Sequence, residues 1–164
     1  MAIDGRRTLR GALAGAVAAG VWLLQQPLDK QIFGWPHDDA ELLGRLMGTD
    51  ASAGTVLHVA NGALFGAVYA NVAPAAPLPP KLRGPAAGLL EHLASWPLAV
   101  LAAPEMSSSP RAFAQSTWRH LLFGFVLGEL ERRMNPPRLE PVSDEAVASN
   151  GHGSAEHLVA SGPR

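Results

Sequence analysis

The side chains of this sequence that could do chemistry lie inside segments that are otherwise almost uncharged. An ionisable group in an apolar segment is costly, about 2.5–3.5 kcal/mol on insertion scales if that segment spans a membrane. Each such group is therefore expected to face the interior of the fold and to meet a polar partner there. We predict that six residues form one polar centre: His58, Asn61, Glu91, His92, Arg119 and His120.

Three kinds of chemistry fit this centre. A Glu91–Arg119 ion pair, with His and Asn side chains bonded to it, would fix which helix meets which. Alternatively, Glu91 and the histidines would form a pathway for protons or ions, because imidazole exchanges protons near neutral pH. A third hypothesis is a metal ion or haem held by three histidines and Glu91. We adopt the orienting ion pair and assign no metal ligand and no cofactor.

The sequence offers little support for an enzyme. Three consecutive serines at 107–109 lie between two prolines, an arrangement typical of a turn. The sequence has no nucleophile elbow, P-loop or GxGxxG motif, and no cysteine for a thiolate site or a disulfide. Its net charge of −1 argues against nucleic acid as a partner. No catalytic residue is predicted.

Four long stretches of the chain have almost no charge. Charged residues make up only 16% of the sequence, against roughly a quarter in a typical soluble domain. A helix of about 20 apolar residues spans a hydrocarbon core of ~30 Å. We therefore predict an all-α fold, a four-helix transmembrane bundle within residues 1–133. Its spans are expected at residues 9–28, 52–72, 84–104 and 112–130.

Two alternatives to this architecture follow from the same stretches. A soluble bundle would bury all four helices, but soluble helices of this length usually carry a polar face, which the first two stretches lack. A twin-arginine export signal would also place Arg6 and Arg7 before an apolar run. We interpret that run as a retained span, because no clean A-x-A cleavage site precedes Gln25 and its glycine spacing recurs in the later spans.

Basic residues predict the orientation of the spans. Eight of them flank the first span, the second connection and the end of the fourth span, whereas the opposite side holds three among six acids. Positive residues favour the cytoplasmic side, so both termini are predicted in the cytoplasm, with the chain in a bacterial inner (plasma) membrane. The lipid bilayer is thus the expected partner. Residues 134–164 lack apolar periodicity and are expected to form a disordered cytoplasmic tail.

Two local features accompany these spans. In the connection after the first span, the run ELLGRLM has apolar residues at helical spacing, and Asp38 or Asp39 could cap it. We expect either a helix in the membrane interface or a plain loop with one helical turn. In the third span, Pro97 is expected to kink the helix, because it cannot donate a backbone hydrogen bond.

Glycines spaced four residues apart occur in every predicted span. Residues four apart share one helix face, and small residues let membrane helices approach closely. These glycines are expected to pack the bundle, or to join copies of the chain in a homo-oligomer. They are Gly11 and Gly15, Gly62 and Gly66, Gly84 and Gly88, and Gly124 and Gly128.

The first two spans also resemble each other. GALAGAVAAGV at residues 11–21 matches GALFGAVYANV at residues 62–72 in eight of eleven positions. Because these spans run in opposite directions, the match is of the kind found in transporters with inverted repeats. Convergence on Gly, Ala and Val is the simpler explanation, and we adopt it.

Three runs resemble bacterial inner-membrane proteins of the YagU-like kind: HVANGALFGAVYANVAP, LRGPAAGLLEHLASWPL and WRHLLFGFVLGELERR. The resemblance covers roughly residues 8–133 and rests on the order of the spans, the glycines and a histidine in a late span. It implies a small four-span membrane protein and transfers no catalytic residue.

The whole sequence therefore predicts an integral membrane protein with an accessory or scaffold role, whose polar centre orients the bundle. A small proton- or ion-coupled transporter acting as a homo-oligomer is the second hypothesis. A metal- or haem-binding membrane protein is the third.

Overall fold

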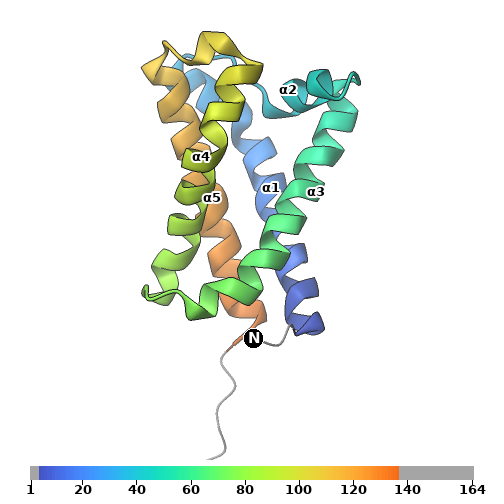
Figure 1. Cartoon of the computed structure of the whole chain (residues 1–164), viewed down its shortest axis with the longest axis vertical. Helices are drawn as coiled ribbons and strands as arrows, with labels where there is room; N and C mark the ends of the chain where they lie inside the picture. Colours follow the sequence, from blue (N-terminus) through green and yellow to red (C-terminus); the bar gives the residue numbers. More distant parts are fainter. Residues whose placement is uncertain (1–3, 137–164) are drawn as a thin grey trace, which may run out of the picture.

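The computed structural model describes residues 4–136, and this part of the chain is entirely helical, without strands (Figure 1). The all-α prediction is thereby confirmed. The predicted tail lies outside the described residues from residue 137 onward. The helices are α1 (Gly5–Phe33), α2 (Asp39–Leu46), α3 (Ala51–Val72), α4 (Pro80–Ala102) and α5 (Pro110–Met134), with short 3-10 helices at Ala73–Ala75 and Pro104–Met106.

The ends of the helices follow from the local sequence. Short polar side chains precede α1, α2, α3 and α5 and accept hydrogen bonds from free backbone N–H groups of the first turn. Asp38 is such a cap, so of the two alternatives for the connection after α1 the helix is confirmed, as α2, while its place in a membrane interface stays a prediction. At the other end of α1, Gly34 has φ = 62°, a left-handed conformation that glycine adopts without strain.

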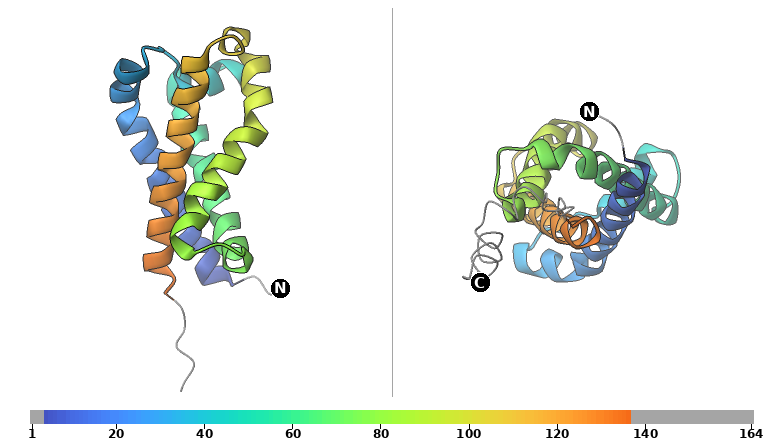
Figure 2. Two further views of the ribbon diagram at one scale, coloured as in Figure 1. Left: turned by 90° about the vertical axis from the view of Figure 1, so that its left-hand side faces the viewer. Right: turned by 90° about the horizontal axis from the view of Figure 1, so that it is seen from below.

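The four long helices form a row that curves back on itself. Helix α1 packs between α3 and α5, and α4 packs on α5 (Figures 1 and 2). Helix α2 lies across the end of α3, on the side of the molecule opposite to the N-terminus. Helices α3 and α4 are the two ends of the row and make few direct contacts with each other. A seam therefore remains between α3 and α4.

Glycines bring the backbones of α1 and α3 into contact. A Cβ atom added at Gly11 would overlap the carbonyl oxygen of Gly66, and one added at Gly66 would overlap the carbonyl oxygen of Gly11. Gly15 and Gly62 oppose each other in the same reciprocal way. The two similar segments thus pack antiparallel, with equivalent glycines at equivalent places across an approximate local two-fold axis.

A second glycine contact joins α4 to α5. A Cβ atom added at Gly84 would overlap the carbonyl oxygen of Gly124 and lie 2.8 Å from the Cα of Gly128. A Cβ atom added at Gly88 would overlap the carbonyl oxygen of His120. All these contacts lie within one chain. A homo-oligomer stays a prediction.

Large polar side chains are buried beside the apolar core, and many large apolar side chains are exposed. The largest fully buried side chains include Asp29, His92, Gln115 and Arg119, whereas 23 large apolar side chains of the described chain are exposed. Two helical segments, α1 and Ala51–Ala75, are long and apolar enough to cross a membrane. Most of the buried polar side chains of the described chain lie on α5.

Candidate functional site

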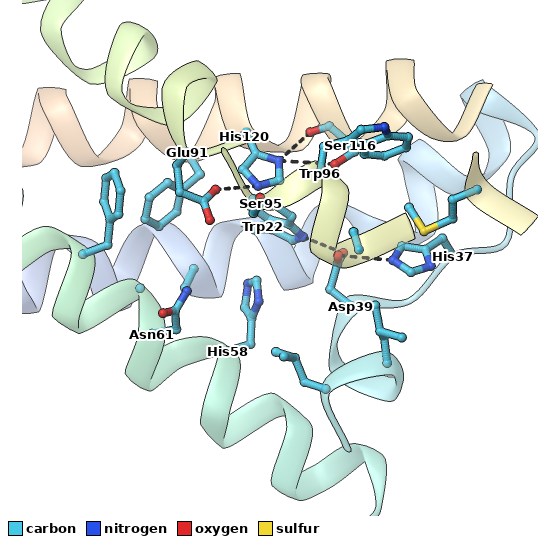
Figure 3. A pocket seen from close by; sticks show the side chains of 18 residues that line it. Trp22, His37, Asp39, His58, Asn61, Glu91, Ser95, Trp96, Ser116 and His120 are labelled. Atoms are coloured by element: carbon cyan, nitrogen blue, oxygen red, sulfur yellow. Dashed lines mark hydrogen bonds and ion pairs between the residues drawn. The ribbon is translucent and has the colours of Figure 1, made fainter. Parts of the chain in front are cut away.

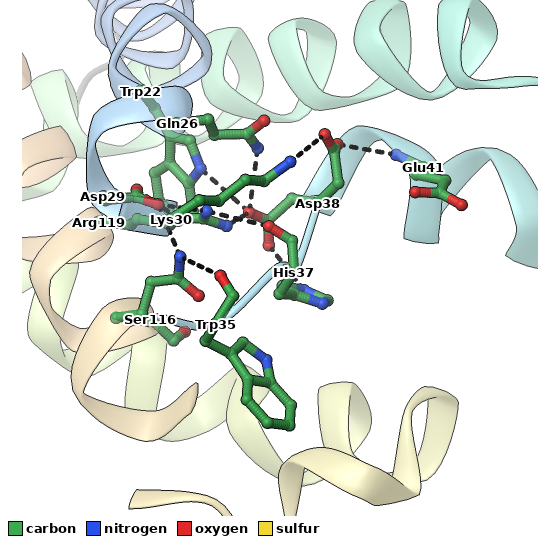
Figure 4. Close-up of polar contacts among 12 residues, drawn as sticks. Trp22, Gln26, Asp29, Lys30, Trp35, His37, Asp38, Glu41, Ser116 and Arg119 are labelled. Carbon is green, nitrogen blue, oxygen red and sulfur yellow. Dashed lines mark hydrogen bonds and ion pairs between the residues drawn. The ribbon is translucent and has the colours of Figure 1, made fainter. Parts of the chain in front are cut away.

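The residues of the predicted polar centre fall into two separate groups. The first surrounds Arg119 on α5, whose side chain is only 1% exposed (Figure 4). Its Nε and Nη2 atoms donate to the two oxygens of Asp29 at 2.6 and 2.7 Å. Its Nη1 atom donates to Asp39, and Nη2 also donates to the carbonyl oxygen of His37 at 3.1 Å. Four of the five guanidinium N–H groups are therefore used.

The predicted Glu91–Arg119 ion pair is wrong. Helix α1 continues to Phe33, five residues beyond the predicted span, and this extension carries Asp29 into the bundle. Successive residues of a helix are turned by about 100°. Arg119 therefore faces α1 and the segment from His37 to Asp39 that follows it, while His120 faces Glu91.

The carboxylate of Asp29 has no hydrogen-bonding capacity left. Besides the two bonds from Arg119, it accepts from Gln25 Nε2 at 2.5 Å and from Gln115 Nε2 at 2.7 Å. Four acceptor positions are all that a carboxylate offers. We call the set of residues joined in this way the Arg119 network: Trp22, Gln25, Gln26, Asp29, Asp39, Gln115 and Arg119.

Asp39 is the second carboxylate of the network. It also accepts from Trp22 Nε1 at 3.2 Å and from Gln26 Nε2 at 3.4 Å. Burial alone would raise the pKa of Asp39, but the hydrogen bond from His37 and the charge of Arg119 outweigh burial and hold that pKa well below its usual range. Asp39 is therefore ionised at neutral pH.

The spacing of three residues in α1 is the sequence feature that points to this network. Trp22, Gln26 and Asp29 follow one another at spacings of four and three, so they share one face of α1. Their polar atoms all meet the network. A helix extended by one turn past the apolar run would have predicted Asp29 as a partner for a buried cation.

The second group is a pair formed by Glu91 on α4 and His120 on α5 (Figure 3). Glu91 Oε2 lies 2.6 Å from His120 Nε2, and His120 Nδ1 lies 2.7 Å from the carbonyl oxygen of Ser116. A carbonyl only accepts, so Nδ1 carries a hydrogen. If Nε2 and Glu91 were both unprotonated, a lone pair would face a carboxylate. Glu91 and His120 therefore share one proton.

His92 lies behind this pair and is fully buried between α4 and α5. Its Nε2 atom lies 3.0 Å from Thr117 Oγ1, which donates its own hydrogen to the carbonyl oxygen of Phe113. Nε2 of His92 therefore donates to Thr117, and Nδ1 accepts from Ser116 Oγ at 3.2 Å. With both nitrogens bonded in this way, His92 is neutral and holds α4 against α5.

A partly open cavity of about 240 Å³ lies beside the Glu91–His120 pair (Figure 3). His58 and Asn61 of α3 face it, and the Nε2 atom of His58 is buried without a hydrogen-bond partner among the described residues. The His58 ring packs edge-on against Trp22 at 5.1 Å. Four members of the predicted centre thus meet at this cavity. His92 lies behind them, and Arg119 belongs to the other group.

A larger groove of about 520 Å³ runs along the seam between α3 and α4. Its walls are almost wholly apolar, with Arg83 as the one Lys or Arg among the described residues that line it. The groove and the cavity share two lining residues, Phe65 and Glu91. Glu91 therefore lies where the cavity meets the apolar groove.

Within the described part of the chain, no three His, Cys, Asp or Glu side chains are placed to hold a metal ion. Comparison of the sequence with protein-family models found no match, and neither did comparison with curated proteins or with solved structures. The resemblance to YagU-like proteins stays a prediction. The function must therefore be inferred from the geometry of this site.

Proposed function

We propose that this chain is a four-span membrane protein that couples a proton, held by Glu91 and His120, to a solute bound in the adjacent cavity. The observation that carries the proposal is the 2.6 Å contact between Glu91 Oε2 and His120 Nε2 at the wall of that cavity. Such a pair requires a proton, and it lies where a solute can compete for the carboxylate.

The assignment of four spans draws support from the exposed apolar side chains. They occur on α4 and α5 as well as on the two more apolar helices. Helix α4 has 23 residues and α5 has 25, which gives each a length of roughly 35 Å, enough for a hydrocarbon core of ~30 Å. Their ionisable groups Glu91 and Arg119 are paired inside the bundle, as a membrane requires.

The proposed orientation places both termini in the cytoplasm of a bacterial inner membrane. The N-terminus of α1 and the C-terminus of α5 lie at the same end of the bundle (Figure 1). At that end Arg7 pairs with Glu131 at 2.6 Å, and Arg10 donates to the carbonyl oxygen of Met134 at 2.9 Å. Basic residues gathered at one end favour the cytoplasmic side there.

The accessory or scaffold role explains one half of the site only. The Arg119 network joins α1, α2 and α5 and so orients the bundle, as a scaffold needs. A scaffold gives no reason for a cavity in which His58 Nε2 is unpartnered and Glu91 is bonded through one oxygen. A proton-coupled solute site accounts for both features.

The shared proton is tested by ¹⁵N NMR of histidine-labelled protein in lipid nanodiscs at pH 7. In Glu91→Gln the new amide N–H donates to His120 Nε2, which then carries no hydrogen of its own. The ¹⁵N signal of His120 Nε2 should therefore move to the position of an unprotonated ring nitrogen. His120→Asn assigns the signal by removing it. Glu129→Gln is the matched control, since among the described residues Glu129 pairs with Arg132 and Arg133 alone, away from the cavity. A His120 Nε2 signal unaffected by Glu91→Gln would overturn the proposal.

A further inference from the structure

We infer that the solute is a lipophilic organic cation, an ammonium with an apolar substituent, whose charged group lies beside Glu91. The inference rests on the proposed function, because the cation displaces the proton that Glu91 and His120 share. It names the chemical class of the ligand from the charge, the aromatic rings and the shape of the cavity.

The first argument is the charge of the cavity. Two carboxylates, Glu91 and Asp39, line it, and no Lys or Arg among the described residues does. Arg119 lies behind the wall and divides its single charge between Asp29 and Asp39. The two carboxylates of Asp29 and Asp39 share one guanidinium, which leaves one negative charge in excess at this wall of the cavity. Such a site repels anions and attracts cations.

The second argument is the aromatic lining. Four aromatic rings face the cavity: Trp22, Phe65, Trp96 and Phe123. The negative faces of such rings attract ammonium groups, most strongly where water is excluded. Trp22 also packs edge-on against His120 at 4.6 Å, which places a large ring next to the proton-binding pair. A carboxylate among aromatic rings is a suitable binding site for an organic ammonium.

The third argument is the shape of the site. The cavity continues past Phe65 and Glu91 into the apolar groove between α3 and α4. Val68 and Leu90 line that groove and are 56% and 70% exposed, so its walls reach the surface that faces lipid in a membrane. An apolar substituent would lie in the groove while the ammonium lies at Glu91. A cation of this kind partitions into the bilayer and would arrive from the side.

The exchange balances in charge and in protons. Without a ligand, Glu91 and His120 together hold one proton and have no net charge. When a monocation binds, Glu91 separates from His120 and becomes the carboxylate partner of the cation, His120 keeps its Nδ1 hydrogen as a neutral ring, and one proton leaves. The pair with its ligand again has no net charge, which avoids an uncompensated charge in a medium of low dielectric constant.

The other ionisable groups around the pair stay as they are during this exchange. Asp39 from α2 and Arg119 from α5 remain paired with each other. His58 from α3 and His92 from α4 remain neutral, His92 because both of its nitrogens are already bonded. We assign proton release upon binding to Glu91 and His120, the pair whose shared proton the cation displaces.

The inference is tested by calorimetric titration of the full chain in detergent with benzyltrimethylammonium, and with benzenesulfonate as the anionic control. The cation should bind. Because one proton is released on binding, its Kd should increase by up to tenfold for each unit by which the pH is lowered. The heat of binding should differ between Tris and phosphate buffers by the value for one released proton. Glu91→Gln should weaken binding at least tenfold, and Glu129→Gln should not change it.

Any other result would contradict the inference, the proton exchange or both. Absence of cation binding by wild type, or equal binding of benzenesulfonate, would overturn the inference, while the NMR test of the shared proton would still stand. Cation binding that is independent of pH and of buffer would overturn the exchange and the proposed function together. Because pH and buffer are varied on the wild-type protein, the test does not depend on the folding of a variant.

Discussion

The Arg119 network and the Glu91–His120 pair lie in the same bundle but differ in how fully their polar atoms are bonded. Asp29 accepts four hydrogen bonds, and Arg119 donates four of its five. Glu91 is bonded through Oε2 to His120, and His58 Nε2 beside it has no partner among the described residues. Asp29 at the centre of the network has no capacity left for a ligand, whereas the Glu91–His120 pair has both capacity and space.

This difference separates a structural role from an exchange role within one cluster of charges. A buried ion that has all its partners fixes the positions of the helices, and loss of one partner leaves another charge unpaired. A pair at a cavity wall can replace a lost partner by water or by a ligand. The predictions that follow test this separation.

The largest effect is expected from Arg119→Gln. It leaves the fully buried carboxylate of Asp29 and the partly exposed carboxylate of Asp39 without their cation, which should lower the free energy of unfolding by about 3–5 kcal/mol. Arg111→Gln is the matched control, because Arg111 is exposed on the same helix. Reversible unfolding in mixed detergent micelles measures both. If Arg119→Gln lowered the free energy of unfolding by less than about 1 kcal/mol, the network would not have the structural role assigned to it.

Gly88→Ala should have the next largest effect. Its Cβ would overlap the carbonyl oxygen of His120 and push α4 away from α5, at a cost of about 1–3 kcal/mol. The same shift should separate Glu91 from His120, visible as a change in the His120 Nε2 signal. Gly20→Ala is the control, since its Cβ would meet no atom within 4 Å and should be neutral or stabilising by up to about 1 kcal/mol. Equal stabilities of the two variants would contradict the close packing of α4 on α5.

Glu91→Gln should lower the free energy of unfolding by less than about 1.5 kcal/mol, because the amide still bonds to His120 and water can enter the cavity. The same detergent unfolding measurement applies. If Glu91→Gln lowered the free energy of unfolding as much as Arg119→Gln, the Glu91–His120 pair would also be structural. The proposed difference between the pair and the Arg119 network would then be wrong.

The smallest effect is expected when the pH is lowered mildly, because the stability that Asp39 contributes should not change. The folded-state pKa of Asp39 is lowered, so its contribution to stability is complete above the unfolded value near 3.8 and is lost only as pH falls through the folded value. The difference in stability between wild type and Asp39→Asn should therefore stay constant from pH 8 to pH 5. A difference that shrinks within that range would show that Asp39 is not held ionised by the network.

Helix positions could be predicted from the sequence because they depend on local composition. The predicted spans at 9–28 and 52–72 lie within α1 and α3, and those at 84–104 and 112–130 overlap α4 and α5. The helix faces that carry the glycines could also be predicted, since residues four apart share a face in any helix. The end of α1 was placed too early, because Gln and Asp after an apolar run look like a loop until a partner for them is known.

The sequence by itself determined that the chain forms long helices, that glycines lie on one face of each, and that His58, Glu91, Arg119 and His120 need partners inside. Only the tertiary structure decided that Arg119 meets Asp29 and Asp39 while Glu91 meets His120. The physical reason is that depth along a helix is set by residue number, but the direction of a side chain turns by about 100° with each residue. Partners are therefore chosen by how each helix is rotated against its neighbours, and that rotation is a property of the packed bundle.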